Sequence, residues 1–333
     1  MGHLQRSWPL RLWRPAASAA LTLLAATLVH GDTLRLGVQD GAVPFAYRAA
    51  GGEAVGYTVQ ICQRIAQRLA RERGRPVELQ YVSVTSKTRL VMLLAGETDL
   101  DCGSTSATDA RRQLRIEFSR PIFVSDAAVL LRREGGLPPT AAMWLQAAVK
   151  APLPVVTTAG STSVRHLSAL REQLPPGQVL RVDYGGDHDD SMRRLLDGRA
   201  SAFVMDRVLL AARLAWAVAS DERVRAALAI TPWSVAPQAV ECYAVALREG
   251  DVELKRAADA TIAEMLDGPD FEVLYSRWFV EPIAPPRAVA ERLGALSPRA
   301  LGLPLPAGLR ERLAQADNAA CAGQARENLG AAR

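Results

Sequence analysis

Hydrophobic and polar residues alternate in two short stretches of the chain, at 33–38 and at 77–84, and this period of two predicts a β-strand in each. Between them, apolar residues recur at helical spacing over 58–71, so this segment is predicted to be an amphipathic helix that ends at Gly74. Its apolar face consists of Val59, Ile61, Cys62, Ile65, Ala66 and Leu69. A strand, a helix and a second strand in this order are typical of an α/β unit.

Similar patterns recur along the rest of the chain. Strands are expected at 98–102, 121–133, 155–156, 179–183, 200–205 and 241–247, and helices at 88–94, from 164 onward, at 191–196 and at 252–266. A Gly- and Pro-rich stretch at 134–140 is typical of a domain boundary, His188 is expected in a polar turn, and two helical stretches are expected after Pro285. Repeated units of this length predict a mainly parallel sheet covered by helices.

Two hydroxyl-rich loops, at 104–106 and 161–163, follow predicted strands. Ser86 and Ser104 also fall at carboxyl ends of strands, where ligands bind in such sheets. Hydroxyls and free amides at helix N-termini attract anions, so the loops are candidate carboxylate sites on two lobes that face one another across a cleft. Helix capping without a ligand is the commoner use of Ser and Thr at such positions, and that alternative remains open here.

The first 31 residues have the organisation of a secretory signal. Arg6, Arg11 and Arg14 precede an uncharged stretch at 15–29 that is rich in Ala and Leu, and cleavage is expected after Gly31. The stretch is shorter than the ~20 residues that span a bilayer comfortably, which disfavours the alternative of an uncleaved anchor. An exported, periplasmic protein is therefore expected.

Charge and histidine content exclude several kinds of partner. The chain has 40 Lys and Arg against 35 Asp and Glu, and removal of the three signal arginines leaves 37 against 35, a net charge of +2. So small a charge gives no reason to expect nucleic acid or an anionic membrane as a partner. Only His166 and His188 of the four histidines remain after cleavage, so no histidine-rich metal site and no cofactor are expected.

The chain has four cysteines, Cys62, Cys102, Cys242 and Cys321, which agrees with an oxidising compartment. No C-x-x-C pair is present, so zinc ribbons and thioredoxin-like chemistry have no support. Three full pairings are possible, and several unpaired buried thiols are the alternative.

Short motifs occur in one order along residues 32–285. They are Val43-Pro44-Phe45-Ala46-Tyr47 with Gly56-Tyr57, Thr85-Ser86-Lys87-Thr88-Arg89, Cys102-Gly103-Ser104-Thr105-Ser106 with arginines ahead of Phe118-Ser119, Gly160-Ser161-Thr162-Ser163, Asp187-His188-Asp189-Asp190-Ser191, Gly198-Arg199-Ala200 through Met205-Asp206, and Tyr275-Ser276-Arg277-Trp278-Phe279. In this ordered set the chain resembles the periplasmic solute-binding proteins of polar amino-acid ABC importers (family 3), and within them the glutamate/aspartate-binding branch.

The resemblance implies a bilobal type II periplasmic-binding-protein fold, an α/β "Venus flytrap". Lobe 1 would combine residues 32–130 with 242–284, and lobe 2 would span 131–241. The chain crossings near Leu130 and Glu241 would form the hinge. The tail at 285–333 has no assigned role.

The resemblance also implies contacts with the α-carboxylate and the ammonium group of an amino acid. A guanidinium and donor groups would hold the carboxylate, and the candidates are Arg111 or Arg112, Ser106, Ser161 and Thr162. Counting forward from Ser104 favours Arg111, whereas counting back from Phe118 favours Arg112. A one-residue insertion relative to the family explains the conflict, and Arg111 is narrowly preferred. Asp206 would hold the ammonium with help from Ser104, and helix capping is the alternative role for Asp206.

Ser86, Arg89 and His188 match positions that hold a distal carboxylate in the glutamate/aspartate branch, and Phe45 of the Pro-Phe turn is counted among the ligand contacts. From the residues alone, a structural ion pair for Arg89 and an ordinary surface or core position for His188 are the preferred interpretations.

Two residues depart from the family pattern. Gln39 stands where glutamate/aspartate-binding members have an arginine, and loss of one charge-assisted bond costs roughly 1.5–3 kcal/mol, about one to two decades in affinity. Arg35 or Arg48 is a candidate to compensate. Arg207 replaces an acidic residue that commonly follows Asp206. A dicarboxylic amino acid is the first choice of ligand, followed by glutamine, asparagine or another polar amino acid.

The expected function is that of the extracytoplasmic binding component of an amino-acid ABC importer, a monomer without catalytic residues that delivers its ligand to a membrane permease. One alternative is an exported dehydratase-like enzyme in which His188 and either Asp187 or Asp189 act as a general base. Another is a sensor module that presents its ligand to a receptor. A serine hydrolase is disfavoured because no G-x-S-x-G motif occurs.

Overall fold

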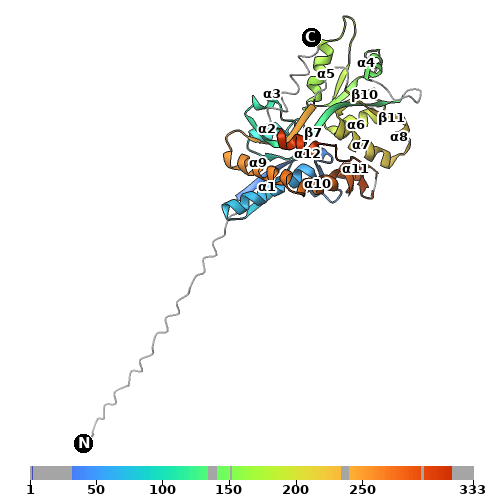
Figure 1. Cartoon of the computed structure of the whole chain (residues 1–333). Coiled ribbons are helices and arrows are strands. Elements are labelled where there is room, and N and C mark those ends of the chain that lie inside the picture. Colours follow the sequence, from blue (N-terminus) through green and yellow to red (C-terminus); the bar gives the residue numbers. More distant parts are fainter. Residues whose placement is uncertain are drawn as a thin grey trace. The chain divides into compact units, whose positions relative to one another are not determined.

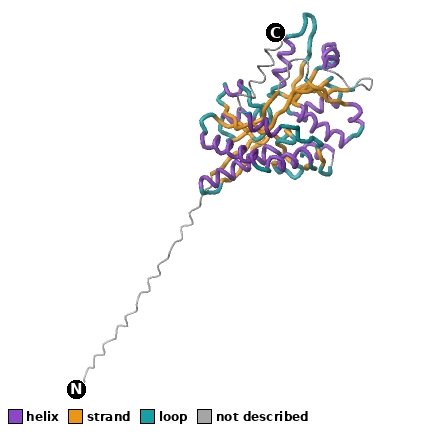
Figure 2. The backbone as a smooth tube through the Cα atoms, in the orientation of Figure 1, coloured by secondary structure: helices purple, strands orange, loops and turns teal. Residues whose placement is uncertain are grey.

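A sheet of nine strands runs through the part of the chain that the computed structural model describes, which is Gly2 and residues 32–133, 141–150, 152–233, 240–293 and 296–316 (Figures 1 and 2). Its strands are β1 (Asp32–Gln39), β5 (Val77–Val84), β6 (Leu100–Asp101), β7 (Ile116–Arg132), β8 (Val155–Thr158), β9 (Val182–Gly185), β10 (Ala202–Asp206), β11 (Leu228–Pro232) and β12 (Val240–Arg248). Small sheets are formed by β2 (Gly41–Ala42), β3 (Ala46–Arg48) and β4 (Ala54–Val55), and by β13 (Pro282–Ile283) and β14 (Arg299–Ala300).

Helices cover this sheet. They are α1 (Tyr57–Arg73), α2 (Arg89–Leu94), α3 (Asp109–Arg112), α4 (Ala141–Lys150), α5 (Ser163–Glu172), α6 (His188–Leu196), α7 (Arg207–Ser220), α8 (Arg223–Ala227), α9 (Val252–Asp267), α10 (Asp270–Tyr275), the π-helix η1 (Ser276–Val280), α11 (Arg287–Leu293) and α12 (Leu309–Gln315). Helix α1 lies alongside α9 although the two are far apart in sequence (Figure 1). Within the described residues, none of these helices is long and apolar enough to cross a membrane.

The sheet is mixed, so the prediction of a mainly parallel sheet is wrong. Strand β1 is parallel to β5 and β6, and β8 is parallel to β9 and β10. The remaining pairs are antiparallel, because β12 returns beside β6 and β7, and because β10 and β11 both run against β7.

The long strand β7 is shared by two halves of the sheet. Its residues 116–126 pair with β12, and its residues 127–132 pair with β10 and β11. We call the first set (β5, β1, β6, β12 and β7 up to Asp126) the β1 half, and the second set (β9, β8, β10, β11 and β7 from Ala127) the β8 half. Each half includes the loops and helices that connect its strands. The change of partners lies four residues before Leu130, and the predicted lobe boundaries at 130/131 and 241/242 stay a prediction.

Most predicted elements are present, with shifts at several places; β7, for example, begins at Ile116 and not at 121. The strand expected at 179–183 begins at Val182, because its parallel partner β8 begins at Val155, opposite Val182. Strand β6 is shorter than the predicted 98–102. His188 does not lie in a turn, because Asp187 accepts a hydrogen bond from the Asp190 amide (2.6 Å) and so starts α6 three residues before the predicted helix. The stretch at 134–140 and the signal-like segment fall outside the described residues, apart from Gly2.

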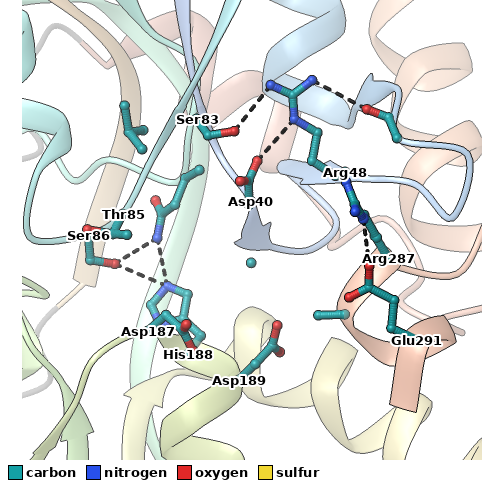
Figure 3. A pocket seen from close by; sticks show the side chains of 15 residues that line it. Asp40, Arg48, Ser83, Thr85, Ser86, Asp187, His188, Asp189, Arg287 and Glu291 are labelled. Carbon is teal, nitrogen blue, oxygen red and sulfur yellow. Dashed lines mark hydrogen bonds and ion pairs between the residues drawn. The ribbon is translucent and has the colours of Figure 1, made fainter. Parts of the chain in front are cut away.

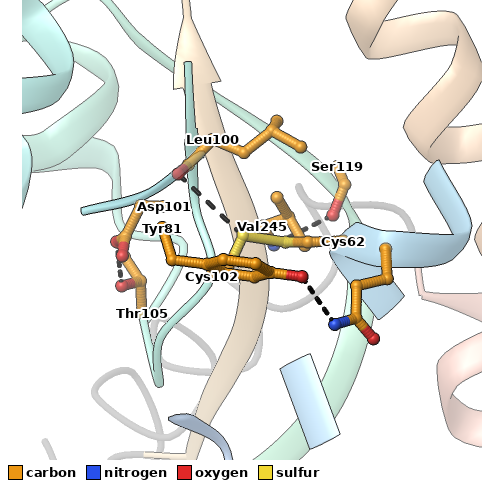
Figure 4. Close-up of a disulfide and its surroundings, with 9 residues drawn as sticks. Cys62, Tyr81, Leu100, Asp101, Cys102, Thr105, Ser119 and Val245 are labelled. Atoms are coloured by element: carbon orange, nitrogen blue, oxygen red, sulfur yellow. Dashed lines mark hydrogen bonds between the residues drawn. A yellow bond between two sulfur atoms is a disulfide. The ribbon is translucent and has the colours of Figure 1, made fainter. Parts of the chain in front are cut away.

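A disulfide between Cys62 and Cys102 joins α1 to the segment that follows β6 (Figure 4), and Cys242 is disulfide-bonded as well. The sequence separation of 40 residues between Cys62 and Cys102 corresponds to a restriction of the unfolded chain of about 4 kcal/mol in the loop-entropy model. Cys102 directly precedes the loop at 104–106, so this bond anchors the start of a predicted binding loop. Cys321 lies outside the described residues.

The tail after Ile283 contacts both halves of the sheet. Val289 of α11 lines a crevice with Met192 and Trp216 of the β8 half. The tail then returns to the β1 half, where Arg120 donates to the Ala314 carbonyl of α12 (2.8 Å) and Leu313 is fully buried. The tail is therefore an integrated part of the fold up to residue 316.

Replacement of the buried Leu313 tests this integration. We expect Leu313→Ala to lower the free energy of unfolding by about 2–5 kcal/mol, because the substitution leaves a cavity in the core. Leu305→Ala, in the same tail but 39% exposed, should change it by less than about 0.5 kcal/mol. Urea unfolding of both variants measures the difference, and equal effects would show that α12 does not contribute to the core.

Candidate functional site

The polar side chains of the candidate site gather at the carboxyl ends of strands from both halves. Gln39 ends β1, Ser86 follows β5 and Ser104 follows β6. On the other side, the loop at 160–162 follows β8, His188 follows β9 and Asp206 ends β10. Because all these ends meet where β7 changes partners, residues far apart in sequence come within hydrogen-bonding distance.

The Gln39 amide joins the three residues that are predicted to hold a distal carboxylate, of which Figure 3 labels Ser86 and His188. Its Nε2 donates to Ser86 Oγ (2.7 Å) and lies 2.9 Å from Nε2 of His188, across the two halves. Its Oε1 accepts from Nη1 of Arg89 (2.7 Å), which fixes the orientation of the amide. Gln39 therefore engages the same groups that a ligand carboxylate would use.

His188 is held in one neutral tautomer by its two neighbours. Since the Gln39 amide donates to Nε2, the ring proton lies on Nδ1, which faces Thr158 Oγ1 at 2.9 Å. Burial lowers the pKa of His188 well below 6.5, and the positive charges of Arg213 and Arg89 lower it further. Neither Asp187 nor Asp189 bonds to the ring: Asp187 caps α6, and Asp189 lies 3.7 Å from Arg213. The His–Asp pair that the enzyme alternative requires is not formed.

The structure separates the two candidate arginines. Arg111 is buried and donates to the carbonyl of Ser106 (2.7 Å) and to that of Gly160 on the opposite half (3.4 Å). Burial lowers its pKa to about 9, with a further contribution from the nearby charge of Arg89. Arg112 instead pairs with Asp109 at 3.0 Å and lies over the ring of Phe118. Of the two, Arg111 lies among the other candidate residues.

Asp206 is buried, and only one of its two carboxyl oxygens has a hydrogen-bond partner among the described residues. Its Oδ2 accepts from the Tyr243 hydroxyl, whereas no described residue bonds to Oδ1. Burial raises the pKa of Asp206 well above 3.8, and the negative charge of Glu241 raises it further. Asp206 stands at the N-cap position of α7 but makes no side-chain capping bond, so the capping alternative is not realised.

The other predicted contacts lie around this cluster. The Ser104 carbonyl accepts from Arg89 (3.3 Å), and the Ser161 hydroxyl donates to the Thr158 carbonyl (2.7 Å). Phe45 packs in the core, where its ring meets Tyr57, Phe123, Tyr243 and Phe279 edge-on. It therefore supports the site through Tyr243, the partner of Asp206.

The arginines considered as compensation for Gln39 have other partners. Arg35 bonds to Asp99 (2.9 Å), and Arg48 lies 3.3 Å from Asp40. Arg207 pairs with Asp126 of β7 at 2.6 Å, so the departure from the family pattern at that position is balanced locally.

Two buried ionic residues were not identified from the sequence. Glu241 of β12 accepts hydrogen bonds from Ser106 and Thr162, and Arg213 of α7 donates to the Gly41 carbonyl across the two halves. Each is a lone charge within an apolar segment, and buried charges require partners. A single charged residue within an apolar segment is therefore the sequence feature that could have identified both residues.

A cavity of about 580 Å³ borders the cluster beside Gln39, Ser86 and His188 (Figure 3). Charged side chains make up much of its remaining lining, namely Asp40, Arg48, Asp187, Asp189, Arg287 and Glu291. The cavity therefore adjoins the predicted distal end of the ligand and is also lined by three residues of α11, Arg287, Ala288 and Glu291. Among the described residues, no group of three or more His, Cys, Asp or Glu side chains is arranged to hold a metal ion.

Two sheet halves that share a strand and bring polar side chains together at their strand ends define a ligand-binding protein with a mixed α/β periplasmic-binding-protein fold. The chain belongs to the bacterial extracellular solute-binding proteins, family 3, whose family model matches residues 34–281. This family is a non-enzymatic component of transport systems, so the resemblance and the absence of catalysis are confirmed, and the enzyme alternative is wrong. The signal peptide stays a prediction.

Individual relatives support this assignment. The glutamate/aspartate import solute-binding protein of Escherichia coli K12 is 31% identical over 274 residues, which cover 81% of this chain and 83% of that protein. An L-glutamate/L-aspartate-binding protein of Pseudomonas aeruginosa is 29% identical over 275 residues, 81% of this chain and 84% of that protein. A solved structure of an ancestral arginine-binding protein bound to glutamine has a TM-score of 0.60 at 21% identity, covering 74% of this chain and 97% of that one.

Gly160 offers a test of the contact between the halves. A Cβ atom at Gly160 would lie 2.4 Å from the carbonyl oxygen of Ser86 on the opposite half, which real Cβ atoms do not tolerate. We expect Gly160→Ala to hold the halves apart and to increase the radius of gyration in small-angle X-ray scattering.

Gly177→Ala is the matched control. Both glycines have a left-handed backbone, with φ of 80° and 86°, so both variants carry a similar strain of about 1 kcal/mol. Gly177 has no atom within 4 Å of its added Cβ, so this variant should scatter like the unmodified protein. Equal radii for both variants and the unmodified protein would show that the contact at Gly160 does not limit closure.

Proposed function

We propose that this protein is the extracytoplasmic amino-acid-binding component of an ABC importer, and that it captures an acidic or other polar amino acid between its two sheet halves for delivery to a membrane permease. Glutamate and aspartate are the first choice. The names of its relatives in E. coli and P. aeruginosa support this ligand class. The buried cluster of opposite charges is the observation that carries the proposal.

That cluster offers complementary partners for the two ends of an amino acid. Asp206 has a buried carboxyl oxygen that no described residue bonds, and an ammonium group is a suitable partner for it. Arg111 is a buried guanidinium whose planar donors match a carboxylate. The positive charge of Arg111 acts on Asp206 electrostatically, so the two groups belong to one buried cluster.

The contacts of Gln39 support a preference for ligands with an acidic side chain, but a weaker one than an arginine at this position would give. Its amide already satisfies Ser86 and His188 and takes one donor of Arg89, whereas Nε of Arg89 has no hydrogen-bond partner among the described residues. A distal carboxylate would draw on that remaining capacity. A distal amide would meet the same groups with no charge to satisfy, which makes glutamine and asparagine the next candidates.

Closure would occur by approach of the two halves. Ligand shifts such an equilibrium only through contacts that the open state lacks, so the groups of the β8 half, Thr162, His188 and Asp206, would determine closure.

Separate replacement of Arg111 and Arg112 by methionine tests which of the two arginines binds the ligand. We expect Arg111→Met to weaken binding of L-glutamate by about 10- to 100-fold, because a buried charge-assisted bond is worth roughly 1.5–3 kcal/mol. Arg112→Met removes the pair with Asp109 and the contact with the Phe118 ring, which are not part of the proposed site, and should change the affinity by less than about fivefold. Isothermal titration of both variants decides between them, and the reverse order would assign the carboxylate to Arg112.

Binding should release protons from Asp206. Its raised pKa means that the ligand-free protein keeps a proton there above pH 3.8, and that folding stability from this group is lost as the pH rises through the raised pKa. An ammonium ligand lowers that pKa again, so titrations between pH 3.8 and neutrality should give heats that depend on the ionisation enthalpy of the buffer. Asp206→Asn should remove this dependence, and its persistence in that variant would assign the proton to another group.

Restoring the family arginine should sharpen specificity. We expect Gln39→Arg to increase the preference for L-glutamate over L-glutamine by about 10- to 100-fold, since the new charge favours a distal carboxylate. Gln39→Met, of similar length without charge or amide, is the control and should not increase it. Competition titrations with both ligands measure the ratio. An unchanged ratio in Gln39→Arg would mean that residue 39 does not face the ligand side chain.

A further inference from the structure

Glu241 lies where the two predicted carboxylate loops meet. Its side chain is 7% exposed, at the start of β12 and opposite Ser125 of β7. The Oε2 atom accepts hydrogen bonds from the hydroxyls of Ser106 and Thr162, the latter at 2.7 Å. Ser106 belongs to the loop after β6 in the β1 half, whereas Thr162 belongs to the loop after β8 in the β8 half. One carboxylate oxygen therefore joins the two halves.

The third neighbour does not neutralise this carboxylate. Nε2 of His166 lies 3.5 Å from Oε1, but burial lowers the pKa of His166 below 6.5, so its ring is neutral at physiological pH. The two hydroxyl bonds are then the close contacts that compensate the charge of Glu241 among the described residues. Arg111 acts on it electrostatically from the same cluster.

The direction of these hydrogen bonds limits what the hydroxyls can do for a ligand. A hydroxyl has a single proton to donate, and here both protons point to Glu241. Ser106 and Thr162 then present lone pairs, which can accept from an ammonium group but cannot donate to a carboxylate. A carboxylate ligand must instead rely on guanidinium and backbone N–H donors.

We propose that Glu241 is a positioning residue of the ligand site: it takes the protons of Ser106 and Thr162, fastens the two loops together, and leaves the ligand carboxylate to Arg111 and backbone amides. This inference rests on the proposed amino-acid-binding function and reassigns two of its contacts. Its consequence is that Thr162 contributes to binding through Glu241 and not through an independent bond to the ligand carboxylate.

A double-mutant cycle tests this dependence, with L-glutamate, L-aspartate and L-glutamine as probes in isothermal titration. We expect Glu241→Gln and Thr162→Val each to weaken binding by about tenfold, since each removes a charge-assisted bond. The double variant should be no weaker than Glu241→Gln alone. Thr162→Ser keeps the hydroxyl and should retain the affinity. Effects that multiply in the double variant, or an unchanged affinity in Glu241→Gln, would overturn the proposal.

Hydrogen exchange of the ligand-free protein separates this inference from the proposed function. Glu241→Gln should accelerate exchange of the amides at 104–106 and 160–163 by about tenfold or more, because the bonds of both loops to residue 241 lose their charge assistance, while the amides of α1 stay protected. If no amino acid binds the unmodified protein but this pattern is seen, the proposed function fails and the positioning role stands. If the loops keep their protection in Glu241→Gln, the positioning role is wrong whatever binds.

Discussion

Burial of charge between the two sheet halves is the constraint on which the rest of the site depends. Arg89, Arg111, Asp206 and Glu241 are each less than 8% exposed, and a charge removed from water is costly unless it is paired and hydrogen-bonded. The fold meets this requirement by ending strands of both halves at one place. Contacts such as that between Thr162 and Glu241 then satisfy one half with groups of the other.

The same constraint explains which buried polar groups the protein satisfies itself and which it leaves for a ligand. The Gln39 amide takes the place of a distal polar group beside Arg89 and His188, and the charge of Glu241 is balanced by hydroxyls near Arg111. Asp206 keeps one carboxyl oxygen without a partner in the described residues. Under the proposed function, an amino acid would supply an ammonium for that oxygen and a carboxylate for the guanidinium, and so would complete the pairing that the protein begins.

Much of the fold could be predicted from local patterns in the sequence. The alternation at 77–84 matches β5 residue for residue, because every second side chain of a strand faces the core, and the helical spacing at 58–71 matches α1 to within two residues. Strand β9 was misplaced because its start is set by pairing with β8, which is a property of the sheet and not of the segment. The polar residues around His188 predict a turn, whereas the capping bond of Asp187 makes His188 the first residue of α6.

The candidate site could likewise be predicted only in part from the sequence. Residues within motifs, such as Ser86, Arg89 and Asp206, were proposed from the sequence, and the fold brings them together. The sequence does not reveal Glu241 and Arg213 as site residues, because their partners are distant in sequence: Ser106 lies 135 residues from Glu241, and Gly41 lies 172 residues from Arg213, on the other half. Spacing from the two ends of one motif could not choose between Arg111 and Arg112, whereas burial distinguishes them at once.

The most direct test of the central claim is isothermal titration of the protein against the standard amino acids, after unfolding and refolding to remove any copurified ligand. The account predicts saturable binding of glutamate or aspartate with a dissociation constant of about 1 μM, roughly −8 kcal/mol, and weaker binding of apolar amino acids. The absence of heat from every amino acid would contradict it, because the buried charges would then require another class of ligand.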